Sequence, residues 1–149
     1  MIFQTEFLTT KVACPLLAEI HHNTFDTGWS EAEFAKLLAM PGALAQFIHI
    51  EKQPVGFCLY LICDKEAEIL TLGILPQNRG CSAATFLLEE GFEYLRAQSV
   101  NRIFLEVSIN NMPALKLYQT TGFAEIGRRS NYYREKTGRA DALILQKEL

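Results

Sequence analysis

The order in which helix and strand signals follow one another limits most what this chain can fold into. Helical spacing of apolar residues covers residues 11–25, 30–40, 82–98 and 111–120. Short apolar runs typical of strands cover residues 45–50, 55–63, 67–75, 103–107, 123–133 and 142–147. Helices interspersed among strands in this way predict a mixed α/β domain.

Local signals indicate where several of these elements begin and end. Ser30 is the expected N-cap of the second helix, because acidic residues follow it in the first turn. Residues 51–54 indicate a hairpin turn, and residues 134–141 a polar loop between the last two strands. In the first helix, we expect one stripe of apolar residues: Val12, Leu16, Ile20 and Phe25.

Length and charge narrow the functional classes. The 149 residues fit one domain, and a hydrophobic content of 49% is sufficient for one core. The formal net charge of −3 gives no electrostatic footprint for a nucleic-acid backbone, although it is compatible with an amine or a basic peptide as partner. The longest apolar runs are too short to span a bilayer, so we expect no membrane partner.

The cysteines and histidines indicate neither a disulfide framework nor a metal site. The four cysteines are scattered and form no C-x-x-C pair; they are Cys14, Cys58, Cys63 and Cys81. Because the N-terminus shows no export signal, we expect free thiols in a reducing cytoplasm. The three histidines have no metal-ligand spacing with these cysteines, so we expect no metal.

The first segment that could form part of a functional site runs from Pro76 to Thr85. It lies between an expected strand and the long helix, and it is rich in small residues. The start of a helix carries unpaired N–H groups and partial positive charge, so it can bind phosphate, and small side chains allow close approach. An ordinary β–α turn with Ser82 as N-cap would have the same sequence. The segment is neither a Walker loop nor a three-glycine dinucleotide fingerprint.

The second segment contains a carboxylate, an asparagine and a tyrosine. Glu106 lies within an otherwise apolar strand and could act as a general base, or it could face solvent or pair with a basic side chain. Asn111 and Tyr118 are seven residues apart, about two helical turns, so they share one helix face. The phenol could protonate a thiolate leaving group. The alternative is a capping asparagine and a half-buried core tyrosine.

The third segment, residues 128–133, ends in Tyr132 and Tyr133. These two tyrosines could wall a substrate cleft. Alternatively, one packs in the core and the other covers a sheet edge.

These three segments, in this order and spacing, resemble the GNAT superfamily of N-acetyltransferases, and the likeness extends over nearly the whole chain. Residues 128–133 followed by Asp141-Ala142 are similar to the branch that acetylates the N-terminal alanine of a ribosomal protein. The resemblance implies an α+β fold, with a mixed, mostly antiparallel, strongly twisted sheet flanked by helices. Two central strands, over residues 67–75 and 103–107, would splay apart to admit acetyl-CoA.

The resemblance also implies roles for particular residues. Glu106 would take a proton from the incoming amine, and Tyr118 would protonate the departing CoA thiolate. The residues expected to bind the cofactor are Leu72, Gly73 and Ile74 along its pantetheine arm, Arg79, Gly80, Cys81, Ser82, Ala83, Ala84 and Thr85 around its pyrophosphate, and Asn111 on the opposite side of the cleft.

The chain departs from the superfamily pattern at Ser82, where the pyrophosphate loop usually has glycine. If that position requires a positive φ, we expect the affinity for the cofactor to fall. Serine is small, however, and its hydroxyl can itself donate a hydrogen bond to phosphate.

Two rival functions follow from the same residues. The first keeps the fold but changes the acceptor to a small amine or a lysine side chain, because acceptor choice depends on loops whose shape the sequence does not give. The second is a non-catalytic acyl-CoA-binding module, which Ser82 favours and the presence of both Glu106 and Tyr118 disfavours. The sequence makes no prediction of the oligomeric state.

Overall fold

A seven-stranded sheet runs through the computed structural model, which describes all residues from 1 to 149. The strands are β1 (Phe3–Leu8), β2 (Ala43–Ile50), β3 (Gln53–Cys63), β4 (Glu66–Ile74), β5 (Arg102–Ser108), β6 (Ala124–Glu135) and β7 (Gly138–Glu148). They lie in the order β1-β2-β3-β4-β5-β7-β6, and only the neighbours β4 and β5 are parallel. The mixed, mostly antiparallel sheet predicted from the sequence is confirmed.

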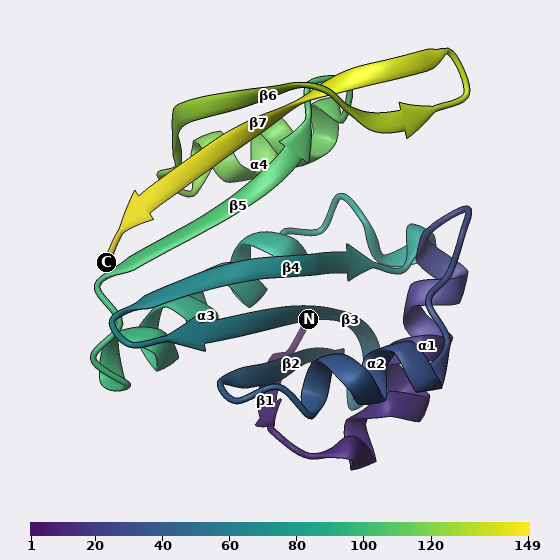
Figure 1. Ribbon diagram of the computed structural model, residues 1–149. Coiled ribbons are helices and arrows are strands. Elements are labelled where there is room, and N and C mark those ends of the chain that lie inside the picture. The colour runs from purple at the N-terminus through teal and green to yellow at the C-terminus, as the bar shows by residue number, and fades with distance from the viewer.

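Helices cover both faces of this sheet (Figure 1). They are α1 (Cys14–Thr24), α2 (Glu31–Leu38), α3 (Ala83–Ala97) and α4 (Met112–Thr120), with short 3-10 turns at Lys11–Ala13 and Pro76–Asn78. The first two helices pack on one face, around Phe34 and Phe57. The other two pack on the opposite face, around Phe92 and Leu105. Because β2 and β3 are covered on both faces, they are apolar almost throughout. None of the helices has the length and the apolar character that a membrane-spanning helix needs.

A buried polar chain fixes the position of α3 against the sheet. Gly91 lets the helix approach closely, because a Cβ at this position would overlap the Tyr60 hydroxyl. That hydroxyl donates to Gln46 Oε1 at 2.8 Å, and Gln46 Nε2 donates to the Leu87 carbonyl at 2.9 Å. Burial holds the pKa of Tyr60 well above its usual value, so the hydroxyl stays protonated. These contacts fix the position of α3 on the sheet, and with it the position of the first turn of the helix.

The parallel strands β4 and β5 meet only where they begin. Residues Glu66–Glu68 pair with Arg102–Phe104, and no later residues of the two strands pair. Arg102 Nη1 and Glu66 Oε2 form an ion pair of 3.1 Å at this joined end. From there the strands diverge, as Figure 1 shows, and β5 turns with β7 and β6 away from the rest of the sheet. The expected splay of the two strands is confirmed.

The structure contains more strand than the sequence predicted. In β1, Phe3 and Phe7 pack against the core, but the alternation is only six residues long and depends on pairing with β2. The prediction of a polar loop over 134–141 is wrong, because β6 and β7 extend until only Lys136 and Thr137 remain between them. A long hairpin satisfies main-chain groups that a loop would leave to water.

Two local details also differ from the predictions. The turn between β2 and β3 is shorter, because Glu51 and Lys52 have φ of 49° and 69°, the pair of positive values that a two-residue type I′ turn requires. The predicted stripe of the first helix is confirmed only in part: Ile20 is buried as expected, but Val12 is 73% exposed and Leu17 is buried in place of Leu16. The 3-10 turn before α1 has a tighter winding, which shifts the phase of the buried face.

The predicted N-cap Ser30 is confirmed, since its Oγ accepts the Glu33 N–H at 3.2 Å.

Candidate active site

The divergence of β4 and β5 opens a cleft of about 1010 Å³. Residues from both strands, from the first turns of α3 and α4, and from β6 line it. The predicted site residues found there are Leu72, Gly73, Ile74, Arg79, Gly80, Ser82, Ala83, Ala84, Thr85, Glu106, Asn111 and Tyr118. Cys81 is the exception, because its thiol donates to the Asn78 carbonyl at 3.0 Å and its side chain packs against the core.

Free main-chain donors gather at the start of α3. Six consecutive N–H groups, from Gly80 to Thr85, have no acceptor within the chain, and the first helical hydrogen bond runs from Phe86 N to Ser82 O. Ser82 stands at the N-cap position, but its hydroxyl does not cap the helix, contrary to the alternative of a conventional cap. Because no side chain satisfies these donors, they and the positive end of the helix dipole make a site suited to an anion.

Two residues shape the loop before α3. Gly80 has a φ of 78°, and a Cβ there would meet no atom within 4 Å, so its backbone conformation rather than crowding favours glycine. Arg79 donates from Nε to the Ile74 carbonyl at 3.0 Å. This hydrogen bond ties the loop to the end of β4, while the side chain of Arg79 lies at the cleft.

Ser82 adopts the left-handed conformation that the sequence analysis considered, with a φ of 68°. Because the chain already holds this conformation without a ligand, we expect Ser82→Gly to raise the free energy of unfolding by about 1 kcal/mol in urea titrations and to leave the affinity for acetyl-CoA nearly unchanged in calorimetric titrations. Ser99 is a matched control, because it has a φ of 66° just beyond the other end of the same helix. Ser99→Gly should stabilise the fold by a similar amount and leave the affinity unchanged. Weaker binding by Ser82→Gly would show instead that the serine hydroxyl contributes to binding.

The edge of β4 that faces the cleft has free main-chain groups. Leu75 donates its N–H to the Val55 carbonyl of β3 at 2.8 Å, so the alternation of the strand turns the N–H and C=O of Leu72 and Ile74 the other way. Of these groups, the Ile74 carbonyl already accepts from Arg79. Gly73 faces the end of α1, where a Cβ would press against the Thr24 methyl group. This unpaired edge can receive an extended ligand as an additional strand.

Glu106 and Tyr118 reach the cleft from opposite faces of the sheet. On β5, Leu105 and Val107 point into the core beside α4, so Glu106 points to the other face. Tyr118, on α4, is 6% exposed and packs edge-on against Phe123 with 5.4 Å between ring centroids. Both side chains line the cleft, which is open because the strands part here.

The Tyr118 hydroxyl is a free proton donor. Burial raises the pKa of this tyrosine above its usual value, so the hydroxyl stays protonated at neutral pH. The Tyr118 hydroxyl makes no hydrogen bond within the chain. Every fully buried side-chain oxygen does have a partner, so the oxygen of Tyr118 is not fully buried and must be accessible from the cleft. Tyr118 therefore packs in the core, as one of the sequence alternatives proposed, and also presents its hydroxyl to the cleft.

Glu106 is paired with a basic side chain, as one of the sequence alternatives held. Arg129 Nε lies 3.1 Å from Glu106 Oε1, and the glutamate side chain is 21% exposed. Tyr133 lines the cleft nearby, and burial together with the negative charge of Glu106 raises its pKa to about 12. Tyr132 is half exposed on the edge strand β6. Tyr133 thus walls the cleft, whereas Tyr132 does not.

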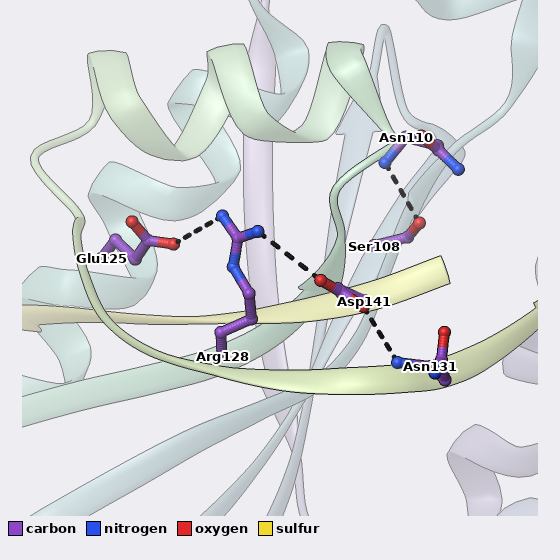
Figure 2. A network of polar contacts seen from close by, with 6 residues as sticks. All are labelled: Ser108, Asn110, Glu125, Arg128, Asn131 and Asp141. Atoms are coloured by element: carbon purple, nitrogen blue, oxygen red, sulfur yellow. Dashed lines mark hydrogen bonds and ion pairs between the residues drawn. The ribbon is translucent and has the colours of Figure 1, made fainter. Parts of the chain in front are cut away.

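A bulge in β6 sets the direction of these tyrosines. Residues 130–132 stand opposite the single residue Asp141 of β7. Figure 2 shows how Asp141 holds the bulge: Oδ1 accepts the Asn131 N–H at 2.9 Å, and Oδ2 lies 3.5 Å from Arg128 Nη1. Asn131 itself has a φ of 54°, which asparagine tolerates better than most residues. The subfamily-like Arg-Arg and Asp-Ala segments are thus joined in space.

The sequence analysis missed a polar cluster beyond the end of β5. Ser108 Oγ and Asn110 Nδ2 both donate to the carboxylate of Glu135, each at 2.7 Å. These two hydrogen bonds, that from Asn110 first, hold the pKa of Glu135 below its usual value. The three side chains line the cleft. Their only sequence signal is that polar residues follow a buried strand, which also describes an ordinary loop.

The N-cap of α4 is Asn111, whose Oδ1 accepts the Ala114 N–H at 3.3 Å. The sequence left Asn110 and Asn111 as alternatives for this cap. Because only Oδ1 is used, the amide nitrogen of Asn111 remains available at the cleft.

A buried histidine fixes the segment after α1 that borders the cleft. His21 is 3% exposed, and its Nδ1 accepts the Trp29 N–H at 3.1 Å, while the two rings stack with 4.8 Å between centroids. Burial lowers the pKa of His21 to about 4, so the ring is neutral. The intervening residues Phe25 and Asp26 line the cleft.

We expect this histidine to make the fold sensitive to mild acid. Because the pKa of His21 falls from 6.5 in the unfolded chain to about 4 in the folded one, the unfolded state binds the extra proton between these values. The free energy of unfolding should therefore decrease by about 1.5 kcal/mol from pH 6.5 to 5. His21→Asn should abolish this decrease in urea titrations, whereas substitution of the exposed His22 should not. An equal decrease in His21→Asn would contradict the assignment.

No group of three or more His, Cys, Asp or Glu side chains is arranged to hold a metal ion.

Comparison with known proteins agrees with this geometry. A family model described as the acetyltransferase (GNAT) family matches residues 14–123. Over 117 residues, 78% of each chain, the protein is 30% identical to the ribosomal protein bS18-alanine N-acetyltransferase of Escherichia coli strain K12. It is also 33% identical over 130 residues, 85% of this chain and 83% of the other, to a Bacillus subtilis protein provisionally assigned the same activity.

A solved structure gives the same result. The crystal structure of the ribosomal-protein-S18-alanine N-acetyltransferase from Escherichia coli superimposes with a TM-score of 0.90 and 25% identity, over 99% of this chain and 94% of that one. The chain therefore belongs to the GNAT family of acetyltransferases and is an acetyl-CoA-dependent N-acetyltransferase.

Proposed function

We propose that this enzyme transfers the acetyl group of acetyl-CoA to the α-amine of an N-terminal alanine, and that its acceptor is ribosomal protein bS18. The observation that carries the proposal is the cleft between β4 and β5, where Glu106 and Tyr118 approach from opposite faces of the sheet. The names of the Escherichia coli relatives support the choice of acceptor.

The residues of the cleft fit acetyl-CoA, which supplies an acyl group activated as a thioester. The free N–H groups from Gly80 to Thr85 would hold the diphosphate. The open edge of β4, at the N–H and C=O of Leu72 and the N–H of Ile74, would pair with the amides of the pantetheine arm. Asn111 would donate from its unused amide nitrogen.

Glu106 and Tyr118 would then handle the two protons of the reaction. The neutral amine attacks the thioester carbon, so the new N–C bond forms as the C–S bond breaks. Glu106 would accept the proton that the amine loses, and Tyr118 would give a proton to the departing sulfur. An α-amine has a pKa of about 7.7–8.0, against about 10.4 for lysine, so the proposed acceptor asks less of the base. Holding amine and thioester together would supply much of the acceleration.

A pair of peptides tests this function. One carries the N-terminal sequence of bS18 with a free alanine amine, and the other has a blocked N-terminus and one lysine. We expect release of free CoA, followed with a thiol reagent, only with the first peptide. Release only with the second would favour the lysine rival. Binding of acetyl-CoA without turnover of either peptide or of small amines would contradict the enzymatic proposal.

A further inference from the structure

We propose that Arg129 is a positioning residue for Glu106, and that Glu68, Glu106 and Arg129 together form the site that receives the positively charged amino terminus of the acceptor. The inference rests on the proposed function, because it assumes that an amine reaches Glu106. It adds two residues, Glu68 and Arg129, to the predicted site.

The guanidinium of Arg129 is held from two sides. Its Nε lies 3.1 Å from Glu106 Oε1, and its central carbon lies 5.2 Å from the centroid of the Tyr132 ring. Tyr132 is in turn supported by Tyr133, with 5.1 Å between ring centroids. Arg129 thereby occupies one oxygen of the glutamate, and Oε2 remains for the amine.

Strand register brings Glu68 to the same place. Glu68 is opposite Phe104 in the last pair that joins β4 to β5, and Glu106 is two residues further on, so all three point to one face. Arg129 lies on this face as well. It pairs with Ala142 of β7, which pairs with Ser108 of β5, and Ser108 is two residues after Glu106. The two carboxylates therefore flank the point where the strands part.

The charges of the three side chains sum to −1 when all are ionised, which matches one ammonium group. Burial and the charge of Glu106 raise the pKa of Glu68, whereas Arg129 lowers it. The guanidinium thus offsets part of the repulsion between the two carboxylates. Of the other titratable groups that line the cleft, Tyr133 and Glu135 of β6, Tyr118 of α4 and Asp26 beyond α1 carry no positive charge. The one cation among them is Arg79, which is tied to the Ile74 carbonyl at the end of β4.

The ion pair can be removed without loss of the fold. The Arg129 side chain is 55% exposed, and pairs with exposed partners contribute little to stability. Arg102 offers a matched control, because its ion pair with Glu66 is also 3.1 Å long and lies at the joined end of β4 and β5.

We expect Arg129→Gln to lower kcat/KM for the acceptor peptide by about tenfold or more at neutral pH, because a misplaced base costs at least that much. The acid limb of the profile of kcat/KM against pH should move to higher pH, since a carboxylate that loses its cationic partner binds a proton more readily. The Kd for acetyl-CoA should not change. Arg129→Lys, which keeps the charge, should restore part of the activity, and Arg102→Gln should behave as the wild type.

A double variant isolates Glu68. In Arg129→Gln/Glu68→Gln, one of the two repelling carboxylates is gone, so the acid limb should move back toward that of the wild type. An acid limb that stays with the single variant would remove Glu68 from the site. If Arg129→Gln and Arg129→Lys both keep the wild-type profile while Glu106→Gln changes it, the inference is overturned and the proposed function stands. If Glu106→Gln also keeps that profile, the role of Glu106 as the base fails too, whereas the proposed function fails only if the alanine peptide gives no release of CoA.

Discussion

Tyr118→Phe is expected to lower kcat by about a hundredfold or more and to leave the Kd for acetyl-CoA nearly unchanged. The tyrosine is almost fully buried, but its hydroxyl makes no hydrogen bond within the chain and faces the cleft. Phenylalanine would fill the same space against Phe123, so the fold and the cofactor site should persist. What is lost is the proton donor to the departing sulfur, an interaction made only as the C–S bond breaks.

Steady-state kinetics with the alanine peptide, combined with calorimetric binding of acetyl-CoA, separates these effects. Tyr94→Phe is the matched control. Tyr94 lies on α3, is partly buried and stacks on Phe7 at 4.0 Å between ring centroids, away from the cleft. The Tyr94→Phe variant should keep the wild-type kcat. A Tyr118→Phe enzyme with unchanged kcat would remove the proposed role of the hydroxyl.

Glu106→Gln is expected to lower kcat/KM for the peptide by about ten- to hundredfold at neutral pH. Without the base, the rate should follow the fraction of acceptor that is already neutral. Because an α-amine has a pKa of about 7.7–8.0, activity of the variant should continue to rise until the pH exceeds about 8. The profile should therefore move toward alkaline pH, and the deficit should shrink there.

The matched control for this substitution is Glu66→Gln. Glu66 also forms an ion pair with an arginine, but it lies at the joined end of the strands, outside the cleft. Its loss should leave the pH profile unchanged. If Glu106→Gln and wild type give superimposable profiles, the general base is another group.

The sequence predicted the features of the fold that arise locally. Ser30 capped its helix as expected because a cap involves only a few neighbouring residues. The splay of β4 and β5 was expected from family resemblance alone, since no local pattern encodes where two strands stop pairing. The strand β1 was missed for the same reason: its six residues become a strand only against β2.

The site was predictable to the extent that its residues lie in recognisable segments. The loop before α3, Glu106 and Tyr118 all line the cleft. Arg129 and Glu68 could not be assigned to it, because a bulge in β6 and the register of β4 against β5 bring them near Glu106. The thiol of Cys81 points away from the cleft, because the direction of a side chain in an irregular loop depends on hydrogen bonds such as the one to Asn78, whereas its main-chain N–H remains one of the proposed diphosphate donors.

The account depends on a thioester entering between two parted strands while its diphosphate lies on the first turn of α3. A crystal structure with bound CoA tests this most directly. We predict diphosphate oxygens within about 3 Å of main-chain nitrogens between Gly80 and Thr85, and the CoA sulfur in the cleft beside the Tyr118 hydroxyl. A diphosphate bound elsewhere, or a sulfur remote from both Tyr118 and Glu106, would contradict the account.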